Sequence, residues 1–198
     1  MKSWIATLLI ALSVLPLATF AQNVGGGALL AGVASQIDGD GWGGYNKIGF
    51  SLGGFAWYDF NDRFSLSPEI LIGMRGSREV KNAYGKFDLS AIDVPVFLRY
   101  RVVGTPDASS LLLEVGPSAN ILISAKSGFG NTKQNVLPMF NKFNISGSLG
   151  ASYFFNPKFA LTGRWTYSLT NLSKSLPQSE TAYWRCHFIL AGIRLAFK

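Results

Sequence analysis

The sequence predicts an all-β protein, an eight-stranded antiparallel up-and-down transmembrane β-barrel. Three observations lead to this prediction. Apolar side chains recur at every second position through most of the chain, which is the period of a β-strand. The connections between these segments alternate between short turns and long loops. Charged residues stand in the middle of several segments on the face opposite the apolar one, as in a barrel with a lipid-facing exterior and a polar interior.

Residues 1–21 are predicted to be a secretory signal peptide, which leaves residues 22–198 as the barrel domain. Lys2 gives a positive start, residues 5–17 are apolar, and residues 19–21 end in small side chains that suit cleavage. The alternative is an uncleaved membrane anchor, but Pro16 and the Thr-x-Ala ending favour a cleaved peptide. Without Lys2 the net charge falls from +7 to +6. An exported chain with this basic balance is expected to meet anionic lipid headgroups, not nucleic acid.

Period-two alternation defines the expected strands. In one of them Ile48, Phe50 and Leu52 share a face, and Gly49 and Ser51 share the other. The eight expected strands are 25–36, 47–60, 64–77, 87–103, 109–124, 142–155, 159–172 and 184–197. Their short connections are 61–63, 104–108 and 156–158, and their long ones are 37–46, 78–86, 125–141 and 173–183. Short turns at one end and long loops at the other predict two different environments, the short turns being periplasmic.

The polarity of the faces decides between two kinds of barrel. A soluble barrel such as a lipocalin packs apolar residues inward, whereas a membrane barrel turns them outward. Here the apolar faces are long enough to cross a bilayer, and the opposite faces carry charge. Isolated buried charge is costly, so the inward charges are expected to pair in a salt-bridge network that plugs the lumen. A conducting pore is therefore disfavoured. The expected network consists of Glu69, Arg75, Asp93, Arg99, Arg101, Glu114, Arg164 and Arg194, in which the excess of arginine predicts that some lie near an end.

Two nearly identical phrases mark one rim of the predicted barrel. "FNDRFSLS" begins at Phe60 and "FNPKFALT" at Phe155, and in each a pair of phenylalanines flanks a short polar turn. These rings share the parity of the apolar face, so they are expected to point outward at the level of the lipid headgroups. Two soluble hairpins could also share such a phrase by chance. The expected interface aromatics are Phe60, Phe64, Phe155, Phe159 and Phe197.

The last strand supplies a separate indication. Gly192, Leu195 and Phe197 stand at the offsets of the carboxy-terminal signal that the barrel assembly machinery reads. The pattern departs from that signal at Leu190, where a polar residue is usual, and in Lys198 after the aromatic.

Three prolines inside expected strands are unfavourable for a closed barrel. Pro68, Pro95 and Pro117 have no N–H to donate to the ladder, and a closed barrel has no free edge for them. Bulges or local breaks are therefore expected at these positions.

Few residues could support chemistry. His187 is the only histidine, and its parity places it outward near the loop end of the last strand; Ser168 or Ser175 would have to lie beside it in space. Cys186 is the only cysteine, which excludes an intrachain disulfide and is typical of a small buried residue. "DGDG" at 38–41 has too few carboxylates for a calcium loop, and the glycine clusters lack a phosphate-loop ending. No catalytic residue, metal site or cofactor is expected.

Five phrases give the chain a family likeness. They are "FSLSPEIL" (64–71), "RGSR" (75–78), "IDVPVFLRY" (92–100), "EVGPSAN" (114–120) and "RWTYSLTNL" (164–172). In their order and spacing the chain resembles the outer-membrane beta-barrel domain family that includes the PorT-like proteins, with Ala91 as a minor departure where an aromatic is common. The resemblance covers most of residues 24–198. It implies an eight-stranded barrel in the outer membrane and little about activity, although PorT itself is linked to protein secretion and gliding.

These observations predict a non-enzymatic protein of the outer membrane of a Gram-negative bacterium, with a plugged polar lumen and a structural, adhesion or secretion-associated role. Its expected partners are outer-membrane lipid, the barrel assembly machinery and a protein partner at the extracellular loops. One alternative is a lipocalin-like carrier of a small apolar ligand, which would use the inward Phe55, Trp57, Phe97 and Leu122. Another is a lipid-modifying outer-membrane enzyme that uses His187.

Overall fold

The computed structural model describes residues 23–80, 85–129, 132–174 and 183–197. The expected signal peptide, residues 1–21, lies outside the described residues. The strands are β1 (Val24–Asp38), β2 (Lys47–Asp59), β3 (Phe64–Arg78), β4 (Gly85–Gly104), β5 (Ser110–Phe129), β6 (Thr132–Asn135), β7 (Phe143–Asn156), β8 (Phe159–Ser168) and β9 (Arg185–Phe197), and a short 3-10 helix, η2, spans Leu137–Met139.

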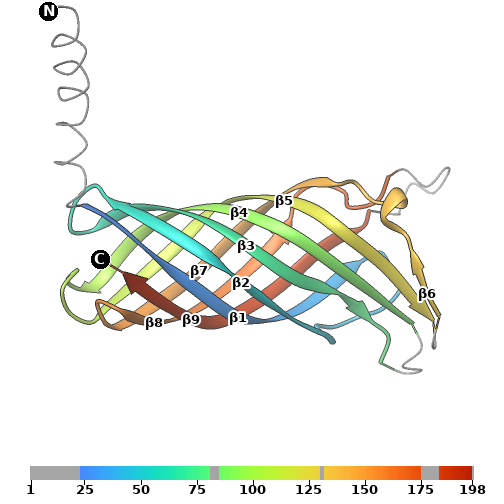
Figure 1. The fold of residues 1–198 in the computed structure, drawn as a ribbon, viewed down its shortest axis with the longest axis horizontal. Helices are drawn as coiled ribbons and strands as arrows, with labels where there is room; N and C mark the ends of the chain where they lie inside the picture. The colour runs from blue at the N-terminus through green and yellow to red at the C-terminus, as the bar shows by residue number, and fades with distance from the viewer. Residues whose placement is uncertain (1–22, 81–84, 130–131, 175–182, 198) are drawn as a thin grey trace, which may run out of the picture.

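Eight of these strands close into a cylinder (Figure 1). Each pairs antiparallel with its neighbours in the order β4-β3-β2-β1-β9-β8-β7-β5, and a further pairing of β4 with β5 joins the two ends of the sheet. The first and last strands meet along their length, from Gly26 opposite Phe197 to Asp38 opposite Arg185. The predicted eight-stranded up-and-down antiparallel barrel is therefore confirmed.

The strand boundaries differ from the predicted ones by more than two residues in two places. Strand β8 ends at Ser168 and not at 172, because Leu169 and Thr170 turn back to donate their N–H groups to the carbonyl of Ile145. Strand β5 continues to Phe129 and forms a hairpin with the short β6, in a region predicted to be loop. This hairpin extends past the barrel at the loop end (Figure 1).

The outer surface of the cylinder is apolar. Ile48 is 71% exposed, Ile70 64% and Val115 58%, and similar residues follow at every second position of the other strands. A surface of this kind marks a barrel that faces lipid, because monomeric soluble proteins rarely expose apolar patches beyond a few hundred Å². Among the described residues, no helix is long and apolar enough to cross a membrane.

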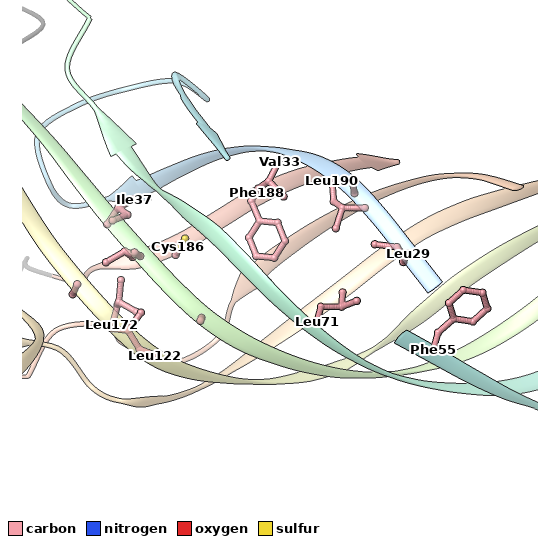
Figure 2. Packing of buried hydrophobic residues seen from close by; sticks show 14 of the residues in the cluster. Leu29, Val33, Ile37, Phe55, Leu71, Leu122, Leu172, Cys186, Phe188 and Leu190 are labelled. Carbon is pink, nitrogen blue, oxygen red and sulfur yellow. The ribbon is translucent and has the colours of Figure 1, made fainter. Parts of the chain in front are cut away.

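The interior holds both apolar and charged side chains along its length, and in the middle Leu71 and Leu190 border the same space as Asp93 and Arg164. Figure 2 shows apolar side chains towards the loop end, where Ile37 of β1, Leu122 of β5 and Cys186 of β9 approach Leu172, which follows β8 in the chain. Cys186 is a free, buried cysteine, as predicted.

The two turns that repeat the same phrase also repeat the same hydrogen bonds. The side-chain oxygen of Asn61 accepts from the N–H groups of Arg63 and Phe64, both at 2.9 Å. That of Asn156 accepts from Lys158 at 2.9 Å and Phe159 at 3.0 Å. An asparagine that bonds to the backbone two residues on stabilises a tight turn, so the repeated phrase encodes both the turn and the outward phenylalanines beside it.

The expected interface aromatics lie at this turn end of the barrel. Phe60, Phe64, Phe155 and Phe197 are exposed, and Phe159 is half-buried because it stacks on Phe155 with ring centroids 5.7 Å apart.

The prolines interrupt the ladder without shifting its register. Partner pairs are missing where Pro68 faces β2, where Pro95 faces β3 and where Pro117 faces β4, yet the register is the same on both sides of each gap. Opposite Pro68 the hydroxyl of Ser67 donates to the carbonyl of Ala56 at 2.7 Å and replaces the missing N–H. The expected local breaks are present. The register shifts lie elsewhere, two of them between β4 and β5 at Ser90/Ala91 and Arg101/Val103.

Candidate functional site

An ionic cluster crosses the middle of the barrel. We call it the ionic plug, and its members are Glu69 on β3, Arg99 on β4, Glu114 on β5, Arg164 on β8 and Arg194 on β9. Period-two alternation turns each of these residues inward, and all five side chains are buried, with Arg194 fully inaccessible. Five strands therefore each contribute one charge to the same level of the lumen.

Glu69 and Arg164 form the span of the plug. Arg164 holds Glu69 with two parallel bonds, Nη1 to Oε2 at 2.6 Å and Nη2 to Oε1 at 2.7 Å. Their strands, β3 and β8, lie four strands apart in either direction around the barrel. Arg194 adds a bond from Nη2 to Oε1 of Glu69 at 2.5 Å. Bidentate guanidinium–carboxylate pairs are among the strongest hydrogen-bonded ion pairs, so this contact ties opposite walls together.

Glu114 is the second anionic centre. It accepts from Arg164 Nε at 3.0 Å and from the hydroxyl of Ser152 at 3.0 Å. Arg194 Nη1 lies 3.2 Å from its Oε1, and Arg99 Nε lies 3.4 Å from the same oxygen. The Arg99 contact is an ion pair without hydrogen-bond geometry. Two carboxylates thus share three guanidinium groups, and the plug has a formal charge of +1.

A glycine makes room for this arrangement. Gly150 on β7 stands between Glu114 on one side and Arg164 on the other in the strand register. A Cβ atom at Gly150 would lie 2.6 Å from Cγ of Arg164 and 2.4 Å from the carbonyl oxygen of Gly163. The absence of a side chain at this position lets Arg164 cross β7 and reach Glu114.

Each inward arginine also lies over an inward phenylalanine. The distances from the guanidinium carbon to the ring centroid are 4.3 Å for Arg164 over Phe97, 4.8 Å for Arg194 over Phe55, 4.9 Å for Arg75 over Phe188 and 5.8 Å for Arg99 over Phe154. A cation over an aromatic face within about 6 Å is stabilised by the ring quadrupole. These pairs were not predicted from the sequence. Period-two alternation indicates that the rings point inward, but it does not indicate which arginine lies over which ring.

A second ionic group lies nearer the loop end. Arg75 binds Asp93 through two bonds, Nη1 to Oδ2 at 2.6 Å and Nη2 to Oδ1 at 2.9 Å. The amide of Asn120 donates to Oδ1 of Asp93 at 2.7 Å, and the hydroxyl of Ser146 donates to the amide oxygen of Asn120. Asn120 and Ser146 were not predicted, although their inward parity on polar faces is visible in the sequence.

Arg101 does not join the network, which corrects the predicted set of eight. The β3–β4 pairs end at Phe64 opposite Tyr100, so Arg101 lies beyond the end of β3. Its guanidinium donates to the backbone carbonyl of Asp62 in the neighbouring turn. Arg101 thus lies at the turn end of the lumen, in keeping with the expectation that some arginines lie near an end, and the other seven predicted residues form two ionic groups inside the barrel.

Interior spaces beside the rings are small. The one that Phe97, Arg164 and Phe188 border measures about 20 Å³, and the one that Trp57 and Arg99 border measures about 40 Å³. Such volumes hold a water molecule or two. The inward rings that a carrier would use to bind an apolar ligand are covered instead by arginine, as with Phe55 and Phe97.

Aromatic side chains close the loop end. Trp42, Phe87, Phe140 and Trp184 form a cluster with ring centroids 5.3 to 6.2 Å apart. The loop that carries Trp42 is held by its own side chains: the backbone N–H of Trp42 donates to Asp40 at 2.8 Å. Burial raises the pKa of Asp40, and the nearby Asp38 raises it further.

His187 lies on the outer surface near the loop end, as predicted. Its Nδ1 is 2.8 Å from the hydroxyl of Tyr45, and its Nε2 is 3.0 Å from Oδ1 of Asp38. Ser168 points into the barrel, where it donates to the carbonyl of Thr170 at 3.0 Å, and Ser175 lies outside the described residues. Within the described part of the chain, no three His, Cys, Asp or Glu side chains are grouped so that they could hold a metal ion.

Comparison with known proteins identifies the family. Residues 19–174 match the model of the outer membrane protein beta-barrel domain. Since this match spans more than half of the chain, the chain belongs to that family, and its location is the cell outer membrane. No curated protein matches the sequence.

Solved structures of small outer-membrane barrels share the fold. Ail, the attachment invasion locus protein of Yersinia pestis, is 17% identical with a TM-score of 0.53, covering 87% of this chain and 98% of Ail. Neisserial surface protein A is 18% identical with a TM-score of 0.51, covering 88% of this chain and 97% of that protein. A second structure of Ail, in complex with the heparin analogue sucrose octasulfate, has 16% identity and a TM-score of 0.51, covering 88% of this chain and 99% of Ail.

Proposed function

We propose that this member of the outer membrane protein beta-barrel domain family is a non-enzymatic, non-conducting surface protein that attaches to anionic polymers through its extracellular end. The observation that carries the proposal is the distribution of charge between the two ends of the barrel. The end with the long loops is taken as extracellular, because outer-membrane barrels have short periplasmic turns and longer extracellular loops.

The extracellular end is basic and the turn end is neutral. Among the described residues, the extracellular end carries eight cations against four acids: Lys47, Arg78, Lys86, Lys126, Lys133, Lys142, Lys174 and Arg185 against Asp38, Asp40, Glu79 and Asp88. The turn end carries three of each: Arg63, Arg101 and Lys158 against Asp59, Asp62 and Asp107. The difference, +4 against 0, favours an anionic partner outside the cell and gives no such preference inside the periplasm.

The ionic plug supports the non-conducting part of the proposal. It fills the lumen where the barrel is only wide enough for side chains, and its pairs hold opposite walls together. A rigid cylinder of this kind is suited to present loops at the cell surface.

Other roles have less support. A lipid-modifying enzyme would need a nucleophile beside His187, and the hydroxyl there belongs to Tyr45, which also accepts a bond from Trp165 Nε1 at 3.0 Å. A secretion-associated role rests on the resemblance to the PorT-like proteins alone. Export by the signal peptide and insertion by the barrel assembly machinery also stay predictions.

The Ail complex suggests a suitable probe. Ail was crystallised with a heparin analogue, and at 16% identity this likeness carries only the fold, so the ligand class is proposed here on the basis of charge. The test uses the purified full chain in detergent, applied to immobilised heparin at increasing salt. We expect retention that falls steeply with salt, because polyanion binding releases counterions.

Matched variants locate the binding surface. Lys142 and Lys174 are both exposed. The loops that carry them lie side by side, since the N–H of Lys174 donates to the carbonyl of Met139 at 2.9 Å. K142A/K174A should elute at lower salt than the wild type, and K158A, at the turn end, should elute with the wild type. Equal elution of all three proteins, or no retention at low salt, would overturn the proposal.

A further inference from the structure

The hydrogen-bonded ladder between β2 and β3 ends before either strand does. The pairs between β2 and β3 stop at Ser51 opposite Gly73. Both strands continue towards the extracellular end with other partners, β2 along β1 as far as Lys47 opposite Ser35, and β3 along β4 as far as Arg78 opposite Lys86. The first residues of β2 are therefore outside the β2–β3 ladder and lie against the outer surface.

The sequence builds this departure into the wall. Gly49 crosses the backbone of β3 so closely that a Cβ atom would lie 1.9 Å from the carbonyl oxygen of Met74. The hydroxyl of Ser35 on β1 bonds to both backbone groups of Gly76 on β3, at 2.8 and 3.0 Å, and so closes the wall behind β2. Gly76 has a φ of +149°, which favours glycine, and a Cβ atom there would meet the carbonyl oxygen of Phe87 at 1.9 Å.

A groove of about 360 Å³ results on the outer surface. This volume lies within the roughly 300–1,000 Å³ of typical small-molecule sites. One side is formed by the exposed Ile48 and Phe50 of β2, and the floor includes the exposed Met74 of β3. The other side is formed by Lys126 of β5 and Lys133 of β6.

The two ends of the groove differ in charge compensation. Lys47 forms an ion pair with Asp88. Lys126 and Lys133 are exposed, and neither forms an ion pair among residues 23–80, 85–129, 132–174 and 183–197, although Asp88 stands opposite Lys126 in the strand register and also borders the groove. Three lysines therefore border the groove against the one carboxylate of Asp88, which leaves an excess of positive charge beside an apolar surface.

The groove lies at the edge of the apolar belt. On β4 the outward side chains change from Ile92 to Ser90 and Asp88 as the strand approaches the extracellular end. On β5 they change from Ile123 to Lys126. Basic side chains immediately beyond a lipid-facing belt are placed at the level of lipid headgroups, where basic pockets bind anionic head groups.

We propose that this groove binds one phosphorylated lipid of the outer leaflet. Lys126 and Lys133 hold its phosphate, and an acyl chain lies along Ile48, Phe50 and Met74. A lipid accounts for both halves of the groove, since a soluble anion would use the lysines and leave the apolar side exposed. This site is tested separately from the polymer-binding surface proposed above, because it faces the membrane and its test changes Lys126 and Lys133 and not Lys142 and Lys174.

The test counts lipids bound to the purified full chain by native mass spectrometry from detergent. The probes are diphosphorylated lipid A, phosphatidylcholine and inorganic phosphate. We expect one molecule of lipid A per chain, little phosphatidylcholine, and no displacement of lipid A by inorganic phosphate. In K126A/K133A the affinity for lipid A should fall about tenfold or more, because two charge-assisted contacts are lost.

Two further variants separate the alternatives. M74S should lower the affinity for lipid A, because it removes an apolar contact while both lysines remain. K142A/K174A should bind lipid A like the wild type. Equal loss in K142A/K174A would mean non-specific attraction, and displacement of lipid A by inorganic phosphate would mean a site for a soluble anion; either result overturns the proposal. Heat-modifiable migration on gels checks that every variant is folded. Loss of heparin retention with intact lipid A binding would contradict only the proposed function.

Discussion

The ionic plug and the outer groove both contain cationic side chains, but their surroundings are opposite. In the plug, three arginines share two carboxylates and every guanidinium lies on an aromatic ring. In the groove, Lys126 and Lys133 are exposed and form no ion pair among the described residues, and the one carboxylate that borders the groove, that of Asp88, is paired with Lys47. Residues of the same charge therefore serve two purposes in one barrel, internal pairing in the first region and recognition in the second.

The residue types match this division. Arginine has a planar fork that binds a carboxylate with two bonds and stacks on rings, so it suits a crowded dry interior. Lysine is a compact, strongly hydrated charge on a flexible stem, so it suits a site that meets a mobile ligand. All four interior cations of the described residues are arginines, whereas both free cations of the groove are lysines.

The largest effect should come from breaking the plug. Glu114→Gln removes one of two negative charges and leaves three buried guanidinium groups facing one carboxylate. We expect a loss of about 3–5 kcal/mol in the free energy of unfolding. Urea unfolding in detergent, followed by tryptophan fluorescence and gel migration, measures it. K142A at the surface is the control, and a Glu114→Gln barrel as stable as this control would show that the carboxylate is not needed.

A smaller loss should follow from removing a ring beneath an arginine. Phe97→Leu keeps an apolar side chain of similar length but deletes the aromatic face that lies 4.3 Å from the Arg164 guanidinium carbon. The expected loss is about 1–2 kcal/mol, since a desolvated cation–aromatic contact contributes about 2 kcal/mol. Leu71→Met, a buried volume-conserving change, serves as the reference. If the two variants unfold at the same urea concentration, the ring acts only by filling space.

The paired turns should respond equally and more weakly. Asn61→Ala and Asn156→Ala each remove an oxygen that accepts two backbone N–H groups. We expect each to lower the free energy of unfolding by about 1 kcal/mol, because water can replace the lost acceptor for these exposed backbone N–H groups. The same urea titration compares them. Markedly different losses would mean that the repeated phrase does not have the same structural role in both places.

The smallest effect on stability should come from the groove. K126A/K133A should change the free energy of unfolding by no more than about 0.5 kcal/mol, because exposed charges without partners contribute little. A large destabilisation would mean that these lysines stabilise the fold, and it would contradict the difference between the two regions.

The sequence predicted the fold and much of the interior for a simple reason. Period two assigns every residue of a strand to the inside or the outside, so Glu69, Glu114 and Arg164 were placed inward by counting alone. Counting also predicted Arg101 to be inward. Arg101 does border the interior space beside Arg99 and Leu112. It stays outside the ionic network because it lies past the end of β3, where its guanidinium donates to the carbonyl of Asp62.

Contacts across the lumen could not be predicted in the same way. Which arginine reaches which carboxylate depends on the stagger of strands around the cylinder, and no local pattern reports the stagger of β3 against β8. The opening between β2 and β3 was invisible for a related reason. It arises where Gly49, Gly76 and Ser35 meet from three strands, and each of them alone is an ordinary strand residue.

The most direct test of the interior pairing is a double-mutant cycle between Glu69 and Arg164. The free energy of unfolding in detergent is measured for the wild type, Glu69→Gln, Arg164→Met and the double variant. If the two residues form one buried bidentate contact, the losses should not add, and the coupling energy should lie at about 1–3 kcal/mol. Additive losses within about 0.5 kcal/mol would contradict the account, because they would mean that charges on opposite walls do not hold the barrel closed.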